Sequence, residues 1–181
     1  TEERLLGIRQ DMLSNLPVPE CAQCMKAESG NRISSRQKVT AEWFRKCPDI
    51  DYNNPPEISY DLRYSNVCNL RCQMCGPIAS STWAKHLGKG DVYYSVDPET
   101  FDINQDAERI YLAGGEPFMV KSFSKLLLSL DNTDCEIIIN TNATILNENM
   151  LKALQRFSNV SFVLSIDGTG ETIEPVSYTH L

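Results

Sequence analysis

The sequence lacks any apolar run long enough to cross a bilayer. A transmembrane helix needs roughly 18 or more apolar residues in succession, and no stretch of the chain approaches that length. The first residues, from Thr1 to Arg4, are largely charged, so they do not resemble a secretory signal peptide. We therefore expect a soluble, cytoplasmic protein that has no membrane partner.

An excess of basic residues is also missing. The chain has 17 Lys and Arg residues against 24 Asp and Glu residues, for a formal net charge of -7. This balance offers no general attraction to phosphate backbones or anionic lipids, so a nucleic-acid partner is unsupported. The hydrophobic fraction of 41% is ordinary for a globular protein with a real core.

The cysteines do not make up the even set that a disulfide framework usually requires. The chain contains seven, and six of them fall between Cys21 and Cys75. In a reducing compartment, such a concentration of thiols favours metal binding over disulfides. The seventh, Cys135, opens an apolar segment, and we expect it to be buried as a small hydrophobic residue.

The first 56 residues are interpreted as an N-terminal extension. A helix is expected from Glu2 to Leu16, because apolar side chains recur there at helical spacing and Pro17 ends the pattern. From Glu20 to Pro56 the sequence is polar and is interrupted by glycine and proline. We expect irregular structure there, with one short helix around Glu42 to Arg45.

Strand and helix patterns alternate beyond Pro56. Strands are expected to begin near Ile58, Arg109, Cys135 and Val160. Amphipathic helices are expected at residues 80–87, at 123–130 and from 147 onward, the first capped by Ser80 or Ser81. Because parallel strands need long crossovers and are buried, this alternation predicts an α/β fold with a parallel sheet. Four strands are too few to close a barrel.

Three cysteines follow the first of these strands at the spacing C-x3-C-x2-C, namely Cys68, Cys72 and Cys75. Thiolates are soft donors that bind iron well, and a short loop can wrap three of them around one cuboidal cluster. Three protein ligands leave one iron without a side-chain donor, and an open coordination position permits chemistry at the metal. The alternative is a structural zinc site or a cluster that only transfers electrons.

The segment from Ser65 to Cys75, followed by Ala113-Gly114-Gly115-Glu116-Pro117 after the second strand, resembles the radical S-adenosylmethionine (radical SAM) superfamily. The resemblance covers residues 58–168. It implies a partial TIM-like (β/α) barrel with about four of six βα units present. It also implies a [4Fe-4S] cluster on the three cysteines, with the amino and carboxylate groups of S-adenosylmethionine on the remaining iron.

The resemblance further implies a set of contacts with S-adenosylmethionine. The two glycines let the backbone approach the cofactor, the glutamate accepts from its ammonium group, and the proline stiffens the turn. A methionine would lie near the adenine, and polar residues at the ends of the third and fourth strands would contact the ribose and methionine portions. Those polar residues also favour turns, which is the structural alternative. The expected contacts are Met74, Gly114, Gly115, Glu116, Pro117, Asn142, Ser165 and Asp167.

A second cysteine pair, Cys21 and Cys24, has the spacing C-x2-C. The pair is followed by Glu28, Gly30, Ser34 and Arg36. The segment resembles those that bind auxiliary clusters in radical SAM proteins of the SPASM and twitch type. It implies ligands for an auxiliary iron–sulfur cluster or a zinc, with Cys47 as a candidate third ligand. Two unligated cysteines are the alternative.

The activity implied by the resemblance is reductive cleavage of S-adenosylmethionine to a deoxyadenosyl radical that abstracts hydrogen from a substrate. A peptide is the expected substrate, and a small reductant protein of the flavodoxin or ferredoxin type is the expected partner. The alternative function is a non-catalytic iron–sulfur or zinc-binding module.

Three parts of the chain are distinguished. Residues 1–56 are the extension with the C-x2-C pair, residues 57–174 are the partial radical SAM core, and residues 175–181 are expected to be an artefactual tail. That last segment resembles a translated sequencing adapter on a C-terminally truncated reading frame.

Overall fold

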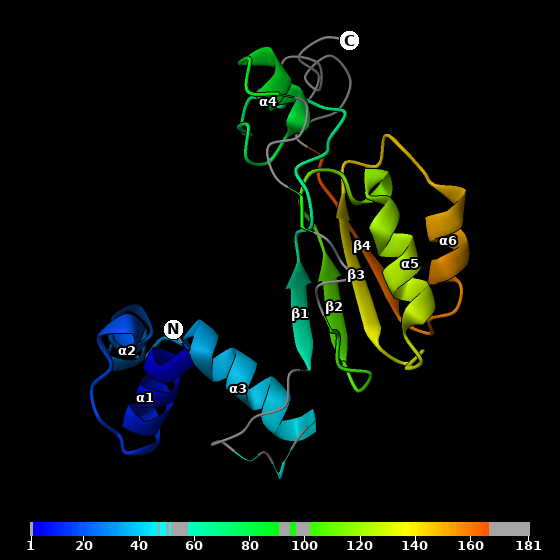
Figure 1. The fold of residues 1–181 in the computed structure, drawn as a ribbon. Coiled ribbons are helices and arrows are strands. Elements are labelled where there is room, and N and C mark those ends of the chain that lie inside the picture. Colours follow the sequence, from blue (N-terminus) through cyan, green and yellow to red (C-terminus); the bar gives the residue numbers. More distant parts are fainter. Residues whose placement is uncertain are drawn as a thin grey trace. The chain divides into compact units, whose positions relative to one another are not determined.

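The computed structural model describes residues 2–46, 48–49, 51, 58–90, 95–96 and 102–166. The chain divides into two compact units, Thr1–Pro56 (unit 1) and Glu57–Leu181 (unit 2). The described part of unit 1 is helical, and unit 2 contains the sheet (Figure 1). The expected tail at 175–181 lies outside the described residues. None of the described helices has the length and apolar character needed to cross a membrane.

Unit 1 is more regular than its sequence predicts. Its described elements are α1 (Glu2–Leu13), the 3-10 helix η1 (Pro19–Cys21), α2 (Ala22–Ser29) and α3 (Ser35–Lys46). The prediction of irregular structure is therefore wrong for residues 20–46, although the short helix expected around Glu42 to Arg45 lies within α3. The reason is local capping: the Ser34 hydroxyl accepts from the Gln37 N–H at 3.1 Å, and the Gln37 side chain accepts from the Ser34 N–H at 3.1 Å. This reciprocal capping box starts α3 despite its polar composition.

The described part of unit 2 contains four parallel strands in the order β1-β2-β3-β4. The strands are β1 (Ser59–Leu62), β2 (Arg109–Leu112), β3 (Glu136–Thr141) and β4 (Val160–Leu164). The connecting helices are α4 (Ser81–His86), η3 (Pro117–Met119), α5 (Lys121–Ser129) and α6 (Glu148–Leu154). Each strand pairs with the next one in the chain, which confirms the predicted α/β class with a parallel sheet whose edges are β1 and β4.

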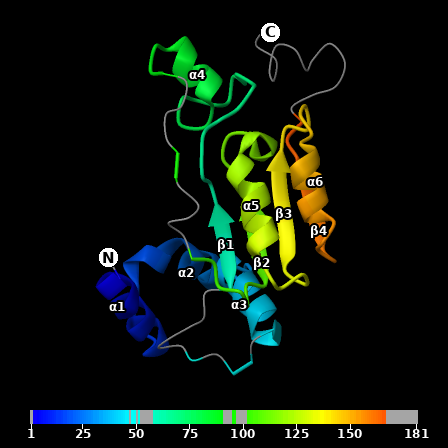
Figure 2. The ribbon, with the colours of Figure 1, turned by 45° about the vertical axis from the view of Figure 1, so that its right-hand side comes forward.

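The core of unit 2 lies between one face of the sheet and the helices α5 and α6 (Figures 1 and 2). Alternate residues of the central strands point to this face, and Ile110 of β2 and Ile137 of β3 are fully buried. The apolar stripe of α5 packs on them through Phe123 and Leu127, which are also fully buried. Cys135 is 1% exposed, as predicted for a small hydrophobic residue.

The carboxyl-terminal end of α5 is held by Arg156, which follows α6. Its guanidinium donates to the carbonyl oxygens of Leu127, Leu128 and Leu130 at 2.9, 2.8 and 3.0 Å. The last carbonyls of a helix have no partner within the helix, and a cation is favourable at that end. Arg156 therefore fixes the end of one helix against the end of the next.

Candidate functional site

The carboxyl-terminal ends of the four strands bring most of the predicted site residues to one edge of the sheet. Parallel strands end at the same edge, which is where βα barrels bind ligands. The residues that follow the strands there are Cys68, Cys72 and Cys75 after β1, Gly114 to Pro117 after β2, Asn142 after β3 and Ser165 after β4. Asp167 lies outside the described residues.

Residues 65–75, which we call the cysteine loop, are held by α4 through their backbone. The hydroxyls of Ser81 and Thr82 donate to the carbonyl oxygen of Cys68 at 3.3 and 2.6 Å. The N–H of Cys68 in turn donates to the Ser81 hydroxyl at 3.1 Å. Both main-chain groups of the first predicted ligand are thereby fixed by the first turn of the helix.

Two further side chains of the same turn extend this contact. Ser80 is the N-cap of α4, as predicted, because its hydroxyl accepts from the Trp83 N–H at 3.3 Å. The same hydroxyl donates to the carbonyl oxygen of Leu70 at 2.6 Å. The indole N–H of Trp83 donates to the carbonyl oxygen of Cys72 at 2.8 Å. Four consecutive residues thus bond to the main chain of the cysteine loop.

A cation–π contact also joins α4 to the loop. The Arg71 guanidinium lies 5.4 Å from the centroid of the Trp83 ring, and the His86 ring meets Trp83 edge-on at 5.5 Å. A nitrogen of Arg71 lies 2.6 Å from Nδ1 of His86. His86 is exposed and lies next to the loop. The sequence does not predict this contact, because Arg71 and His86 are 15 residues apart in different elements.

The double glycine after β2 lies against the cysteine loop. A Cβ added at Gly115 would lie 2.1 Å from the carbonyl oxygen of Val67, and one at Gly114 would lie 2.6 Å from that of Ser65. Gly114 also has φ +118°, a conformation that other residues rarely adopt. The N–H of Gly115 donates to the Ser65 carbonyl at 2.9 Å. Main-chain atoms of the cysteine loop therefore lie in close contact with the two glycines, where the resemblance implies a close approach of the cofactor.

Glu116, the next residue, is fully buried and bonds to the end of β3. Its Oε1 accepts from the Thr141 hydroxyl at 2.6 Å and from the Phe118 N–H at 3.2 Å, and its Oε2 accepts from the Asn142 N–H at 2.8 Å. The resemblance to the radical SAM superfamily implies that this carboxylate accepts from the cofactor's ammonium group. In the structure it joins the ends of β2 and β3, through partners about 25 residues away.

The other predicted cofactor contacts have different surroundings. Met74 has a side chain that is 85% exposed. Ser165 continues the ladder between β3 and β4 by donating its N–H to the Thr141 carbonyl at 2.9 Å, and its hydroxyl donates to the Asn140 side chain at 2.9 Å. Asn142 points its side-chain amide at the cysteine loop.

The three loop thiols differ in exposure. Cys75 is exposed, whereas Cys68 and Cys72 are partly buried. Burial raises the pKa of Cys68, and the charges of Glu116 and Cys75 act in the same direction. The N–H of Leu70 opposes this increase by donating to the Cys68 sulfur at 3.4 Å.

The donor set of the loop fits an iron–sulfur cluster. Three thiols occur within one short loop, and a main-chain N–H is directed at one of the sulfurs. Within the described residues, no three His, Cys, Asp or Glu side chains form a group that could hold a single metal ion. In a cuboidal cluster, however, thiolates bind different irons, so the ligands do not have to converge on one point.

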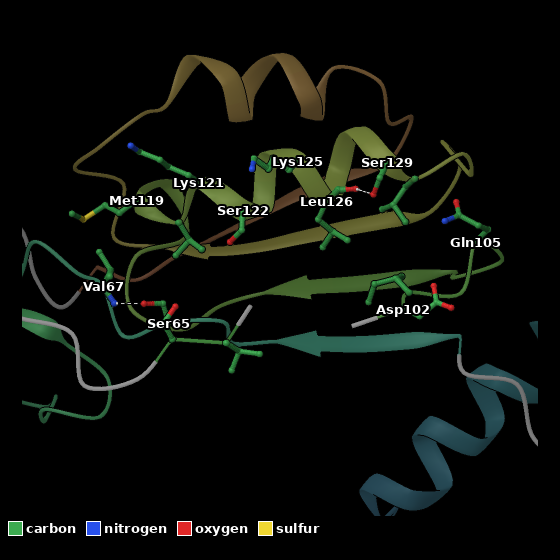
Figure 3. A pocket seen from close by; sticks show the side chains of 15 residues that line it. Ser65, Val67, Asp102, Gln105, Met119, Lys121, Ser122, Lys125, Leu126 and Ser129 are labelled. Carbon is green, nitrogen blue, oxygen red and sulfur yellow. Dashed lines mark hydrogen bonds between the residues drawn. The ribbon is translucent and has the colours of Figure 1, made fainter. Parts of the chain in front are cut away.

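A cavity of about 880 Å³ lies in unit 2 between α5 and the start of the cysteine loop (Figure 3). Lys121 and Lys125 of α5 line one side of it, and Ser65 and Val67 line the other. None of the three loop cysteines borders this cavity, and neither does Glu116 or Asn142. The cavity thus borders the start of the cysteine loop, but none of the predicted ligands or cofactor contacts within the described residues lines it.

The second cysteine pair lies at the start of α2 in unit 1. Cys21 is the N-cap of α2 and Cys24 lies in its first turn, and both thiols are free and partly buried. The Cys21 sulfur lies 3.9 Å from the sulfur of Met12. Cys47, the candidate third ligand, lies outside the described residues.

A polar network stands beside this pair. Glu28 of α2 accepts from the Ser34 hydroxyl at 2.6 Å and forms a bidentate ion pair with Arg36. The Ser34 and Arg36 contacts lower the pKa of Glu28. The bond to Glu28 raises the pKa of Arg36, and the thiolates of Cys21 and Cys24 act in the same direction. The arginine thus places a fixed positive charge near both thiols.

Comparison with known proteins identifies relatives of this chain. Sporulation killing factor maturation protein SkfB of Bacillus subtilis (strain 168) is 25% identical over 115 residues. The aligned part covers 64% of this chain and 27% of SkfB, so the chain spans about a quarter of that relative.

Solved structures of Streptococcus suis SuiB are also similar. SuiB bound to S-adenosylmethionine gives a TM-score of 0.42 at 15% identity and covers 78% of this chain and 30% of SuiB. SuiB bound to precursor peptide SuiA gives a TM-score of 0.43 at 14% identity and covers 87% of this chain and 38% of SuiB. The family model of the Radical SAM superfamily matches residues 62–180, well over half of the chain. The chain therefore belongs to the radical SAM superfamily.

Proposed function

We propose that this chain contains the cofactor-binding part of a radical SAM enzyme. Cys68, Cys72 and Cys75 would hold a [4Fe-4S] cluster, leaving one iron for S-adenosylmethionine. Reductive cleavage of S-adenosylmethionine at such a cluster supplies a deoxyadenosyl radical that takes hydrogen from a substrate. The observation that carries the proposal is the cysteine loop at the end of β1, fixed by α4 on one side and by the double glycine on the other.

The chain's own residues would position the cofactor rather than react with it. The hydroxyls of α4 fix the backbone of the first ligand. Glu116 holds together the carboxyl-terminal ends of β2 and β3. Such prior fixing reduces the ordering that binding requires. Met74, with its exposed side chain, remains our candidate for the adenine contact.

The test is anaerobic reconstitution with iron and sulfide, followed by reduction with dithionite in the presence of S-adenosylmethionine. We expect about four irons per chain in the loop cluster and formation of 5′-deoxyadenosine. Alanine at Cys68, Cys72 or Cys75 should abolish both, whereas Cys135→Ala should retain both because Cys135 is buried in the core. Zinc in the loop, or a loaded cluster that yields no deoxyadenosine, would favour a non-catalytic module.

We further propose a peptide substrate. SkfB, a relative of this chain, is named as a sporulation killing factor maturation protein, and the similarity supports a substrate that undergoes maturation. The electron donor is proposed to be a small protein of the flavodoxin or ferredoxin type, as expected for the superfamily. Replacing dithionite with a reduced flavodoxin in the same assay tests the second part, since deoxyadenosine should still form.

We also propose that Cys21 and Cys24 contribute ligands to an auxiliary iron–sulfur cluster. The support is their placement on one turn of α2 beside the charge of Arg36, which can stabilise an anionic thiolate cluster. The Cys21→Ala/Cys24→Ala double variant should lose part of the iron but keep deoxyadenosine formation. Equal iron content in the variant and the parent protein would leave the pair as unligated cysteines.

A further inference from the structure

Asn142 is joined to the cysteine loop by a closed ring of hydrogen bonds. Its Nδ2 donates to Oδ1 of Asn69 at 3.1 Å, the Nδ2 of Asn69 donates to the Thr144 hydroxyl at 2.8 Å, and that hydroxyl donates back to Oδ1 of Asn142 at 2.6 Å. Asn69 lies directly after the first predicted ligand. The ring therefore joins the end of β3 to the loop that carries the cysteines.

The backbone fixes the direction of this ring. The N–H of Thr144 donates to Oδ1 of Asn142 at 3.0 Å, and a main-chain N–H cannot accept a hydrogen bond. The oxygen of the Asn142 amide must therefore face Thr144, and its nitrogen must face the cysteine loop. The two atoms of an asparagine amide are distinguished only by such partners.

The same nitrogen also reaches a predicted cluster ligand. Nδ2 of Asn142 lies 3.9 Å from the sulfur of Cys68, which also accepts from the N–H of Leu70 at 3.4 Å. One amide hydrogen serves Asn69 and the other serves this sulfur. With both lone pairs of its oxygen engaged by Thr144, the side chain has its full set of partners within the chain.

The position of Asn142 is set by the buried carboxylate. The main-chain N–H of Asn142 donates to Oε2 of Glu116 at 2.8 Å, and Thr141 donates to Oε1. Glu116 is fully buried and therefore cannot easily shift. Ala143, between Asn142 and Thr144, adopts the left-handed conformation with φ 57°, which lets the chain turn back on the amide.

We propose that Asn142 is a positioning residue for the cluster ligand Cys68, to which its amide donates an N–H···S hydrogen bond that favours the reduced cluster. The inference rests on the proposed function. Reduction adds one electron to the cluster, and a donor directed at a ligand sulfur stabilises the added negative charge. Hydrogen bonds to the sulfurs are among the factors that set cluster potentials.

The test compares Asn142→Leu with Asn140→Leu in the anaerobically reconstituted chain. Asn140 lies two residues earlier on β3, and its amide oxygen accepts from Ser165 rather than contacting the cysteine loop. A redox titration followed by electron paramagnetic resonance gives the midpoint potential, and iron and sulfide analyses give the occupancy. We expect full occupancy in both variants, a more negative midpoint in Asn142→Leu and an unchanged midpoint in Asn140→Leu.

A second measurement covers the case in which Asn142→Leu loses the cluster. Asn142→Asp keeps an oxygen for Thr144 but lacks both N–H donors, and Asn140→Asp places the same charge two residues away. We expect the Fe–S stretching frequencies to shift between H2O and D2O in the parent protein, and this shift to shrink in Asn142→Asp but not in Asn140→Asp. A parental H2O/D2O shift in Asn142→Asp, or a parental midpoint in fully loaded Asn142→Leu, would overturn the inference. Failure of the parent protein to load a cluster would instead contradict the proposed function.

Discussion

Gly115 lies so close to Val67 that any side chain would occupy the place of the carbonyl oxygen, since an added Cβ would be 2.1 Å away from it. Contacts of this length involve backbone on both sides and cannot be relieved by rotating a side chain. The double glycine is therefore needed to seat the cysteine loop, whatever contact it makes with a ligand.

We predict that Gly115→Ala displaces the loop and destabilises the protein by roughly 1–3 kcal/mol, the range for overpacking a well-packed contact. Iron uptake on reconstitution should fall with it. Gly76→Ala is the matched control, because an added Cβ there meets nothing within 4 Å. Thermal unfolding and iron analysis of both variants provide the measurement, and equal behaviour of the two would contradict the prediction.

Glu116→Gln should destabilise unit 2 by about 1–3 kcal/mol. Glutamine keeps the shape of the side chain, but its nitrogen would face one of the three donors that the carboxylate now accepts from. Urea unfolding followed by circular dichroism measures the change. Glu148→Gln, at an exposed position in the first turn of α6, should change stability by at most about 0.5 kcal/mol.

Arg156→Met should expose the end of α5 to fraying. Methionine retains much of the packing of the arginine stem but loses three hydrogen bonds to helix-terminal carbonyls, so we expect a loss of about 1–3 kcal/mol. Amide hydrogen exchange should accelerate in the last turn of α5 more than in β3. Lys152→Met, on the exposed part of α6, is the control, and similar exchange in both variants would remove the role assigned to Arg156.

We predict that the folded protein loses stability at alkaline pH because of the buried Cys135 thiol. Burial raises the pKa of this thiol from 9.0 to about 11, and the nearby carboxylates of Glu136 and Glu108 add to the increase. The unfolded chain loses this proton at lower pH than the folded chain does, so the contribution is complete below pH 9 and is lost between pH 9 and about 11. Urea midpoints measured across this range should fall less steeply in Cys135→Ala than in the parent protein. Parallel curves would show that the pKa of this thiol is the same in the folded and unfolded states.

The sheet of unit 2 could be predicted because each of its elements carries its own periodic pattern. The strand of Ile137 and Ile139 is apolar because it is buried, and the α5 stripe through Phe123 and Leu127 repeats at helical spacing for the same reason. These signals are local, so the order of strands and helices follows from reading along the chain. The predicted cap at Ser80 is local in the same sense.

The contacts that organise the site are not local, and this is why the sequence could not predict them. Glu116 meets Thr141 across 25 positions, and Asn142 meets Asn69 across 73. A glutamate after two glycines gives no indication of whether it points toward a ligand or toward the next strand. Only the paired registers of β1, β2 and β3 bring these residues together.

In unit 1 the prediction fails for the opposite reason. A local capping signal is present in the sequence, but the polar composition of the segment led us to expect irregular structure. The polar stretch after Glu20 suggested irregular structure, yet the Ser34 and Gln37 pair has the spacing of a capping box. Caps contribute only about 0.5–2 kcal/mol, but in a short polar helix they decide where regular structure begins.

The hydrogen bonds from Ser80, Thr82 and Trp83 to the cysteine loop affect which side chains of that loop can be substituted. The hydroxyl and indole donors bond to main-chain carbonyls, which every amino acid carries, so these bonds, which help to set the path of the loop, do not depend on the side chains of the residues that supply the carbonyls. Met74 projects outward from that path. The side chain at this position can therefore be substituted without moving the neighbouring thiols. Such a substitution would change the surface that we propose faces the ligand.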